Sequence, residues 1–132
     1  MKVAHILAAV TLSGLSAMSH ADCVNSIDEQ YLARKMSFGS EAQGAETVLN
    51  CKKPINAYDK VVCSNPKLKR LDAVSVQSVV ADVANQQKWD IDEDQTKLLA
   101  KKEYQFRYKK AGKTPESICK FLLKELKETR GG

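Results

Sequence analysis

Apolar positions in this chain recur at three- and four-residue steps, and the best-defined run covers residues 66–87. Its stripe combines one leucine with four valines: Leu68, Val76, Val79, Val80 and Val83. Valine is only a middling helix former, but the spacing is that of a helix face and not of an alternating strand. Asn65 and Pro66 supply an N-cap and the favoured first-turn proline. The pattern therefore predicts a helix from Pro66 to Gln87.

Helix-start signals predict two further elements in the first part of the chain. Ser26-Ile-Asp-Glu29 is a capping-box pattern, so a helix should begin at Ile27 and end near Gly39. Ser40-Glu-Ala-Gln43 repeats the pattern and predicts a short helix or turn.

Three more helices are predicted around Cys63 and in the last third of the chain. Asn56 is suited to cap a short helix that ends at Cys63. Acidic residues just before Gln95 favour a helix start there, with an end near Gly112. Thr114 and the proline after it start the last helix. The first of these helices carries Tyr58, Val61 and Val62, and the second carries Leu98, Leu99, Tyr104, Phe106 and Tyr108. In the last helix, Ile118, Phe121, Leu122 and Leu126 form an apolar stripe.

The N-terminal residues have the pattern of an export signal. Lys2 precedes a mostly apolar stretch at 6–15, and Ser19-His-Ala21 is a small-x-small cleavage site. The apolar stretch is too short to cross a bilayer, and nothing later in the chain is apolar enough. We therefore predict a signal peptide over residues 1–21 and one exported domain over 22–132, periplasmic or secreted. No strand pattern appears, so that domain should be an all-α bundle of four to five helices.

Four cysteines lie in the predicted exported chain, and they change the expected source of stability. An even number of cysteines in a small exported protein favours two disulfides over metal or redox chemistry. No C-x-x-C spacing is present. Three pairings are possible for Cys23, Cys51, Cys63 and Cys119.

The residue types argue against an enzyme. Both histidines, His5 and His20, belong to the predicted signal peptide. Without them, Ser–His and Cys–His nucleophile pairs and histidine-ligated zinc are excluded. We therefore expect a non-enzymatic protein with no catalytic residue, no cofactor and no metal site.

Charge is distributed unevenly along the chain. Residues 22–96 carry a net charge of −3, whereas residues 97–132 carry +7. A basic C-terminal third can attract an acidic partner or an anionic surface, but lysines on solvated helix faces are also ordinary. Tyr104, Phe106 and Tyr108 lie among these lysines. Core and surface positions alternating on a helix explain them better than nucleic-acid stacking does, and we expect no nucleic-acid partner.

Two acidic features need an interpretation. Asp90-Ile-Asp-Glu-Asp94 invites a calcium-loop reading, but Gln95 and Lys101 stand where an EF-hand needs glycine and glutamate. A helix-capping acidic loop fits better, and beside Trp89 it is a candidate contact surface.

Asp72 lies one turn after Leu68 on an apolar stripe. We interpret it as a hydrogen-bonding or ion-pairing residue that fixes a neighbouring helix.

The segment from Cys51 to Asp72 carries a family resemblance. Cys51-x11-Cys63-Ser-Asn-Pro-x-Leu68-x-x-Leu71-Asp72 resembles the N-terminal motif of the LprI-like lysozyme inhibitor family, small exported helical proteins of bacteria. The similarity covers about residues 48–87. In the C-terminal part, Tyr104-Gln-Phe-Arg107 stands where the family has a tryptophan and an arginine. Cys119 echoes the family's final element.

The resemblance implies a helical, disulfide-stapled envelope protein. We predict a local Cys51–Cys63 bridge, and a Cys23–Cys119 bridge that closes a loop of about 100 residues. By resemblance the protein inhibits lysozyme or another peptidoglycan hydrolase. The expected contact surface has Trp89 as an apolar anchor, which is equally suited to core packing, beside the acidic residues Asp90, Asp92, Glu93 and Asp94. The alternatives are an immunity protein against a cell-wall-degrading toxin and a secreted adaptor that binds a host surface through its lysines. The oligomeric state is not predicted.

Overall fold

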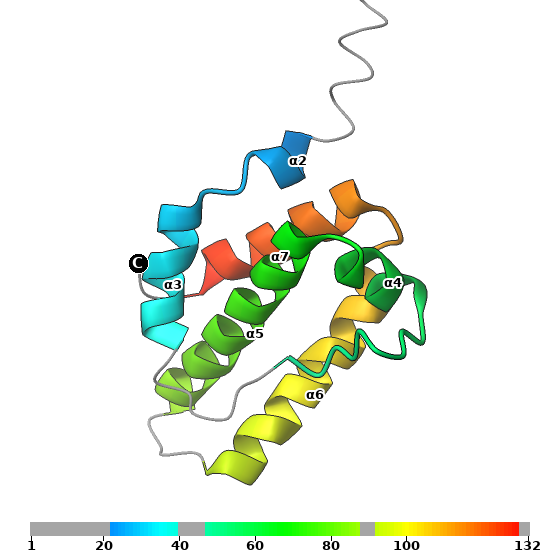
Figure 1. Cartoon of the computed structure of the whole chain (residues 1–132). Coiled ribbons are helices and arrows are strands. Elements are labelled where there is room, and N and C mark those ends of the chain that lie inside the picture. Colours follow the sequence, from blue (N-terminus) through cyan, green and yellow to red (C-terminus); the bar gives the residue numbers. More distant parts are fainter. Residues whose placement is uncertain (1–21, 40–46, 88–91, 130–132) are drawn as a thin grey trace, which may run out of the picture.

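The computed structural model describes residues 22–39, 47–87 and 92–129, and every regular element in them is a helix (Figure 1). The bounds are α2 Asp22–Asn25, α3 Glu29–Gly39, α4 Ala57–Cys63, α5 Pro66–Gln87, α6 Glu93–Lys110 and α7 Pro115–Glu128. The predicted all-α class is confirmed, with the single turn of α2 as an unpredicted addition. The predicted signal peptide and the predicted turn at 40–43 lie outside the described residues.

Helix α5 is the centre of the bundle. It packs against α3, α4, α6 and α7, and α6 runs back along it in the opposite direction (Figure 1). α7 crosses its N-terminal half, while α3 lies on the other flank. The predicted start and end of α5 are confirmed, and Asn65 Oδ1 accepts the amide hydrogens of Lys67 and Leu68 at 3.1 and 3.3 Å. A central helix with four neighbours explains why its stripe is wide and made of small apolar residues.

Most of the predicted caps are present. Asn56 accepts the amide of Asp59 at the start of α4, and Thr114 forms a capping box at the start of α7. The predicted capping box of Ser26 is wrong: the Ser26 hydroxyl donates to Cys23 O, and Asp28 accepts from the amide of Gln30. Because Asp22–Asn25 form α2, the chain must turn before a new helix can begin, and α3 starts at Glu29.

Two apolar clusters form the core. The larger one joins α2, α3, α4 and α7 to the first half of α5 and includes Leu32, Tyr58, Leu71, Ile118 and Leu122 among its buried side chains. The smaller one lies between the second half of α5 and the first half of α6 and contains Val76, Val80, Ala81 and Ala100.

The large apolar side chains of α6 are divided between the core and the surface. Leu99 and Tyr104 are partly buried and pack against the two apolar clusters, whereas Leu98, Phe106 and Tyr108 are exposed. The fully buried residues of this helix are Thr96, Ala100 and Arg107, and hydrophobic periodicity does not reveal them because they are small, polar or charged. A buried arginine needs several acceptors, which come from other helices.

A buried lysine connects α3 to the end of α7. Lys35 on α3 is buried, and its Nζ donates to Thr129 O and Oγ1 at 2.8 and 3.0 Å, which ties α3 to the end of α7. Burial lowers the pKa of Lys35, and Asp82 partly opposes this.

Gly112 has φ +87°, and a Cβ there would lie 2.5 Å from Ser117 Oγ, so the turn between α6 and α7 requires glycine.

Both predicted disulfides are confirmed. Cys23–Cys119 joins α2 to α7 across a sequence separation of 96, and Cys51–Cys63 joins the loop before α4 to the end of that helix across 12. The long bridge is buried inside the larger apolar cluster, whereas the short one is half-exposed.

We predict that loss of the long bridge costs more stability than loss of the short one. In the unfolded chain, the difference between closing loops of these two lengths is about 2 kcal/mol. Cys23→Ser/Cys119→Ser should lower the melting temperature by more than about 10 °C, and Cys51→Ser/Cys63→Ser by clearly less. Thermal unfolding followed by circular dichroism measures both. Equal losses, or a reduced protein that melts within a few degrees of the oxidised one, would contradict this account of the bridges.

Candidate functional site

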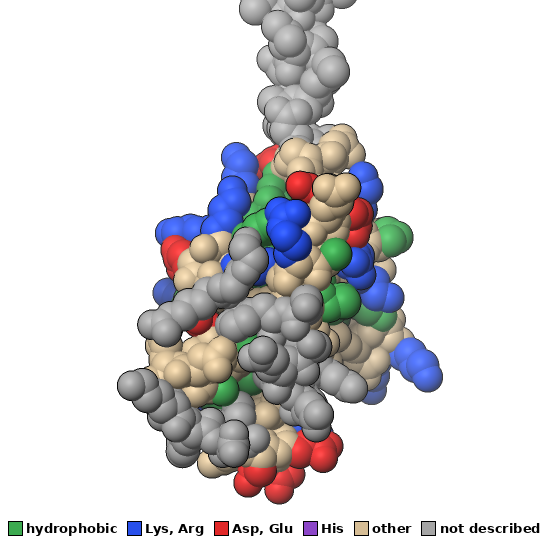
Figure 2. Space-filling model, turned by 90° about the vertical axis from the view of Figure 1, so that its left-hand side faces the viewer, with side chains coloured by type: hydrophobic (Ala, Val, Ile, Leu, Met, Phe, Trp, Pro, Cys, Tyr) green, Lys and Arg blue, Asp and Glu red, His purple; other side chains and the backbone are tan. Residues whose placement is uncertain are grey.

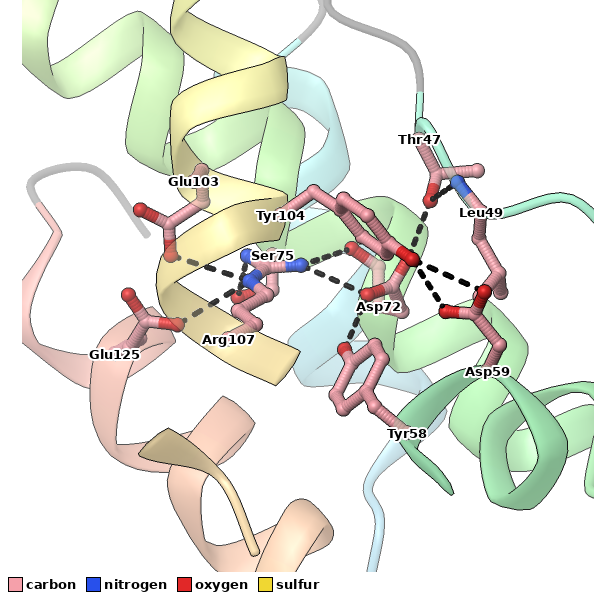
Figure 3. A network of polar contacts seen from close by, with 10 residues as sticks. All are labelled: Thr47, Leu49, Tyr58, Asp59, Asp72, Ser75, Glu103, Tyr104, Arg107 and Glu125. Carbon is pink, nitrogen blue, oxygen red and sulfur yellow. Dashed lines mark hydrogen bonds and ion pairs between the residues drawn. The ribbon is translucent and has the colours of Figure 1, made fainter. Parts of the chain in front are cut away.

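Arg107 lies at the centre of a buried network of charged and polar side chains (Figure 3). Its side chain is 1% exposed and reaches from α6 into the space between α5 and α7. Nη1 donates to the side-chain and backbone oxygens of Asp72 at 2.9 and 3.1 Å, and Nη2 donates to Ser75 Oγ at 3.0 Å. Nε faces Glu103 and Glu125 at 3.1 and 3.3 Å. One guanidinium thus connects three helices.

The Asp72 carboxylate receives hydrogen bonds from three side chains around it. Besides Arg107, the hydroxyls of Tyr58 and Thr47 donate to its two carboxylate oxygens. Tyr58 comes from α4, and Thr47 from the segment that leads into the Cys51 loop. The interpretation of Asp72 as a residue that fixes neighbouring elements is therefore confirmed.

A second polar group adjoins the first through α4 and α6. The hydroxyl of Tyr104 donates to Asp59, with Oδ1 at 2.8 Å, and Asn56 Nδ2 donates to the Tyr104 oxygen at 2.9 Å. The second oxygen of Asp59 accepts the backbone amide of Ile55 at 3.2 Å. Tyr104 therefore holds the loop before α4 against α6. No buried side-chain nitrogen or oxygen among the described residues lacks a hydrogen-bond partner.

The electrostatics of Arg107 and Tyr58 follow from this packing. Burial acts to lower the pKa of Arg107, but Asp72 and its other anionic neighbours more than compensate, so the pKa rises and the guanidinium stays charged. Burial and the adjacent Asp72 both raise the pKa of Tyr58, which keeps its hydroxyl as a donor. Burial and the bond to Asp59 likewise raise the pKa of Tyr104 to about 12.

Glu103 and Glu125 crowd the same side of Arg107. Burial and a hydrogen bond with Glu103 raise the pKa of Glu125 to about 8, against the opposing attraction of Arg107. With Asp72 already paired, one cation cannot neutralise two more carboxylates, so a proton held by Glu125 relieves the excess negative charge. This pair therefore makes the network sensitive to pH.

The arrangement has the properties of a structural centre. Two carboxyl groups that cleave a glycosidic bond stand at least about 5 Å apart across an open cleft. Here Glu125 and Glu103 face the same Arg107 Nε at 3.3 and 3.1 Å, and their side chains are 15% and 13% exposed. The surface pockets beside Cys23, Thr47 and Ile55 are lined by other residues than these two. The network's donors and acceptors are used to join helices.

The predicted acidic contact surface is described only in part. Asp92 is the N-cap of α6 and forms a capping box with Gln95, and Glu93 pairs with Lys97 at 3.0 Å. Asp92, Glu93 and Asp94 are all exposed. Acidic side chains gather at the lower end of the molecule, where α6 begins, while lysine and arginine side chains, with a few acidic ones among them, are scattered higher up (Figure 2). Trp89 and Asp90 lie outside the described residues.

Sequence reasoning missed the buried role of Arg107 and its two glutamates. Arg107 drew attention only through the family resemblance and through the lysines around it. The available signal was Asp72: a carboxylate on the apolar face of a central helix requires a buried cation. Which residue supplies this cation depends on how α6 packs against α5, and local sequence patterns do not determine that packing.

Comparisons with known proteins add no relative. No protein-family model, no curated protein and no solved structure matches the chain. The described residues contain no group of three or more histidine, cysteine, aspartate or glutamate side chains placed to hold a metal ion. No helix in the same ranges is both long and apolar enough to cross a membrane.

We predict that Arg107→Met destabilises the protein by about 3–5 kcal/mol, because it leaves buried carboxylates without their cation. Arg70→Met is the matched control: Arg70 pairs with Glu29 at 2.6 Å on the surface, and its loss should cost less than about 1 kcal/mol. Urea unfolding measures both. If Arg107→Met does not fold, Arg107→Lys, which keeps the charge but loses the forked donors, should still show a larger loss than Arg70→Lys. Similar losses at the two positions would contradict a central role for Arg107.

We also predict that stability falls as the pH rises from about 5 to 8. The pKa of Glu125 is about 8 in the folded protein and near 4.5 when unfolded, so the folded state binds the extra proton over this interval. The stabilising contribution is complete below the unfolded pKa and is lost as the pH passes the folded one. Urea midpoints between pH 5 and 9 measure the effect. Glu125→Gln should flatten the profile, while Glu128→Gln, an exposed position on the same helix, should leave it unchanged.

Proposed function

We propose that the protein is an exported, non-enzymatic binding protein of the bacterial envelope that inhibits a lysozyme or another peptidoglycan hydrolase. The observation that carries the binding role is the closed polar centre. The buried arginine, aspartate and tyrosines bind one another and join α4, α5, α6 and α7 into a fixed frame (Figure 3). Such a frame is suited to present surfaces to a partner.

The two disulfides support the location outside the cytoplasm. Structural disulfides persist in oxidising compartments such as the periplasm and the extracellular space, and both bridges here connect elements of the frame. The signal-peptide pattern at residues 1–21 points the same way.

The acidic end of α6 supports the kind of target. Lysozymes are commonly basic, so an inhibitor needs an exposed acidic surface for steering and specificity. Asp92, Glu93 and Asp94 form such a surface, and the capping box fixes its backbone. The motif from Cys51 to Asp72, through its resemblance to the LprI-like family, supports the choice of a peptidoglycan hydrolase among basic partners.

The test is a lysis assay with the oxidised protein over residues 22–132. We expect it to slow the clearing of a cell-wall suspension by a basic lysozyme in a dose-dependent way. Asp92→Asn/Glu93→Gln/Asp94→Asn should raise the concentration for half-inhibition by about tenfold or more. Asparagine at position 92 keeps the N-cap, so α6 stays intact.

The matched control neutralises three exposed carboxylates elsewhere. Asp28→Asn/Glu29→Gln/Glu128→Gln removes the same charge and also replaces one helix cap by asparagine. Its inhibition should stay within about twofold of the unchanged protein. A protein that leaves lysis unaffected even at high molar excess is no lysozyme inhibitor, and equal losses in both triple variants would mean that the acidic end of α6 is not the contact surface.

A further inference from the structure

Exposed apolar side chains gather where the loop before α4 meets α6. Ile55 is 78% exposed, Val48 42% and Tyr108 36%, and all three line one shallow pocket with Lys101 and Tyr104. We call these five residues the Ile55 surface. Leu98, 53% exposed, lies one turn before Lys101 and continues the same face of α6. Four of the five large exposed apolar side chains of the described residues thus share one region, whereas exposed apolar residues are normally scattered.

The Ile55 surface is held in shape by the interior. The amide of Ile55 donates to Asp59, and Tyr104 donates to the same carboxylate. The Tyr104 ring packs against the Tyr108 ring, with 5.2 Å between the ring centroids. The Cys51–Cys63 bridge closes the loop that carries Ile55. A surface that is already ordered loses little conformational freedom when a partner binds.

The exposed charged side chains of the two segments that carry the Ile55 surface have a single sign, and the first exposed carboxylate before them on α6 is Asp94, one turn ahead of Leu98. Every charged side chain that is exposed in residues 47–60 and 98–113 is a lysine: Lys52, Lys53, Lys60, Lys101, Lys102, Lys109, Lys110 and Lys113. The other charged residues of these segments are bound internally: Asp59 and Arg107 are buried, and Glu103 is partly buried and faces Arg107. Complementarity therefore selects a partner with carboxylates around an apolar centre.

We propose that the Ile55 surface docks an acidic segment of another protein, which places an apolar side chain against Ile55 and Tyr108 while its carboxylates face the lysines. Protruding aliphatic groups such as Ile55 and Val48 suit a protein partner better than a sugar or a nucleic acid, which would use aromatic faces for stacking. The site lies apart from the acidic end of α6 in sequence and has the opposite charge. It therefore does not depend on the proposed hydrolase inhibition, and it would give the protein a second partner.

The test uses defined peptides and the oxidised protein over residues 22–132. The probe is a fluorescein-labelled peptide of alternating aspartate and glutamate with leucine and tryptophan at its centre. One comparison peptide replaces the two apolar residues by alanine, and another replaces all carboxylates by lysine. Fluorescence anisotropy should show binding of the first peptide alone at micromolar protein, and the amide shifts in nitrogen-15 NMR spectra should centre on residues 48–55 and 101–108.

Paired variants separate the Ile55 surface from general charge attraction. Ile55→Asp and Lys101→Glu should each weaken binding at least about tenfold. Phe106→Asp changes another exposed apolar residue of α6, which packs on Phe121, and Lys124→Glu changes an exposed lysine of α7. Both controls should bind within about twofold of the unchanged protein, and melting curves identify any variant that has lost its fold.

Three results would overturn the proposal. The first is no binding of the acidic apolar peptide up to millimolar protein. The second is equal binding of the alanine peptide, or an equal loss in Lys124→Glu, because either one shows non-specific charge attraction. The third is binding to phosphatidylglycerol vesicles that depends on Ile55 and Lys101 while the peptide does not compete, which would assign the surface to a membrane. The lysis assay is independent of all three.

Discussion

The fold depends on the pairing of Arg107 with Asp72. A charge buried without a partner costs several kcal/mol, so α6 can dock on α5 only where the guanidinium meets its acceptors. On α6, Arg107 lies between Ala100 of the smaller apolar cluster and Ala111 of the larger one, and on α5, Asp72 lies beside Leu71 and Val74 of the larger cluster. Apolar packing alone tolerates small slips between two helices, but a five-donor fork with fixed acceptors does not. The pair therefore sets the register of α6 on α5.

The hydrogen bonds of this pair also help to position an exposed loop. Asp72 binds Tyr58 of α4 and Thr47 of the preceding segment, and Asp59 binds Tyr104 of α6 (Figure 3). These contacts, with the short disulfide, position the loop that carries Ile55. The buried contacts thus hold in place a surface loop that has little apolar packing of its own. A loop that is already ordered loses less conformational freedom when a partner binds.

The molecule separates its charges along one helix. α6 begins with exposed acidic residues and ends among lysines, as the helix macrodipole favours. This separation stabilises the helix by itself, and it also creates two surfaces of opposite sign. The proposed hydrolase contact uses the acidic end and the proposed peptide contact uses the lysine-rimmed surface, so the two roles do not compete for the same residues.

By itself the sequence determined the elements. The start of α5 at Asn65-Pro66, the caps at Asn56 and Thr114 and the stripe of α7 are local patterns, because they depend on contacts within a few residues. The two bridges followed from the cysteine number and the family resemblance. Only the tertiary structure decided that Arg107 lies on the buried face of α6 while Leu98 and Phe106 do not, that burial beside Glu103 raises the pKa of Glu125, and that Ile55 is exposed on a fixed loop. Each of these depends on groups brought together from distant positions, and the cost of burying a charge is settled only when its partner is in place.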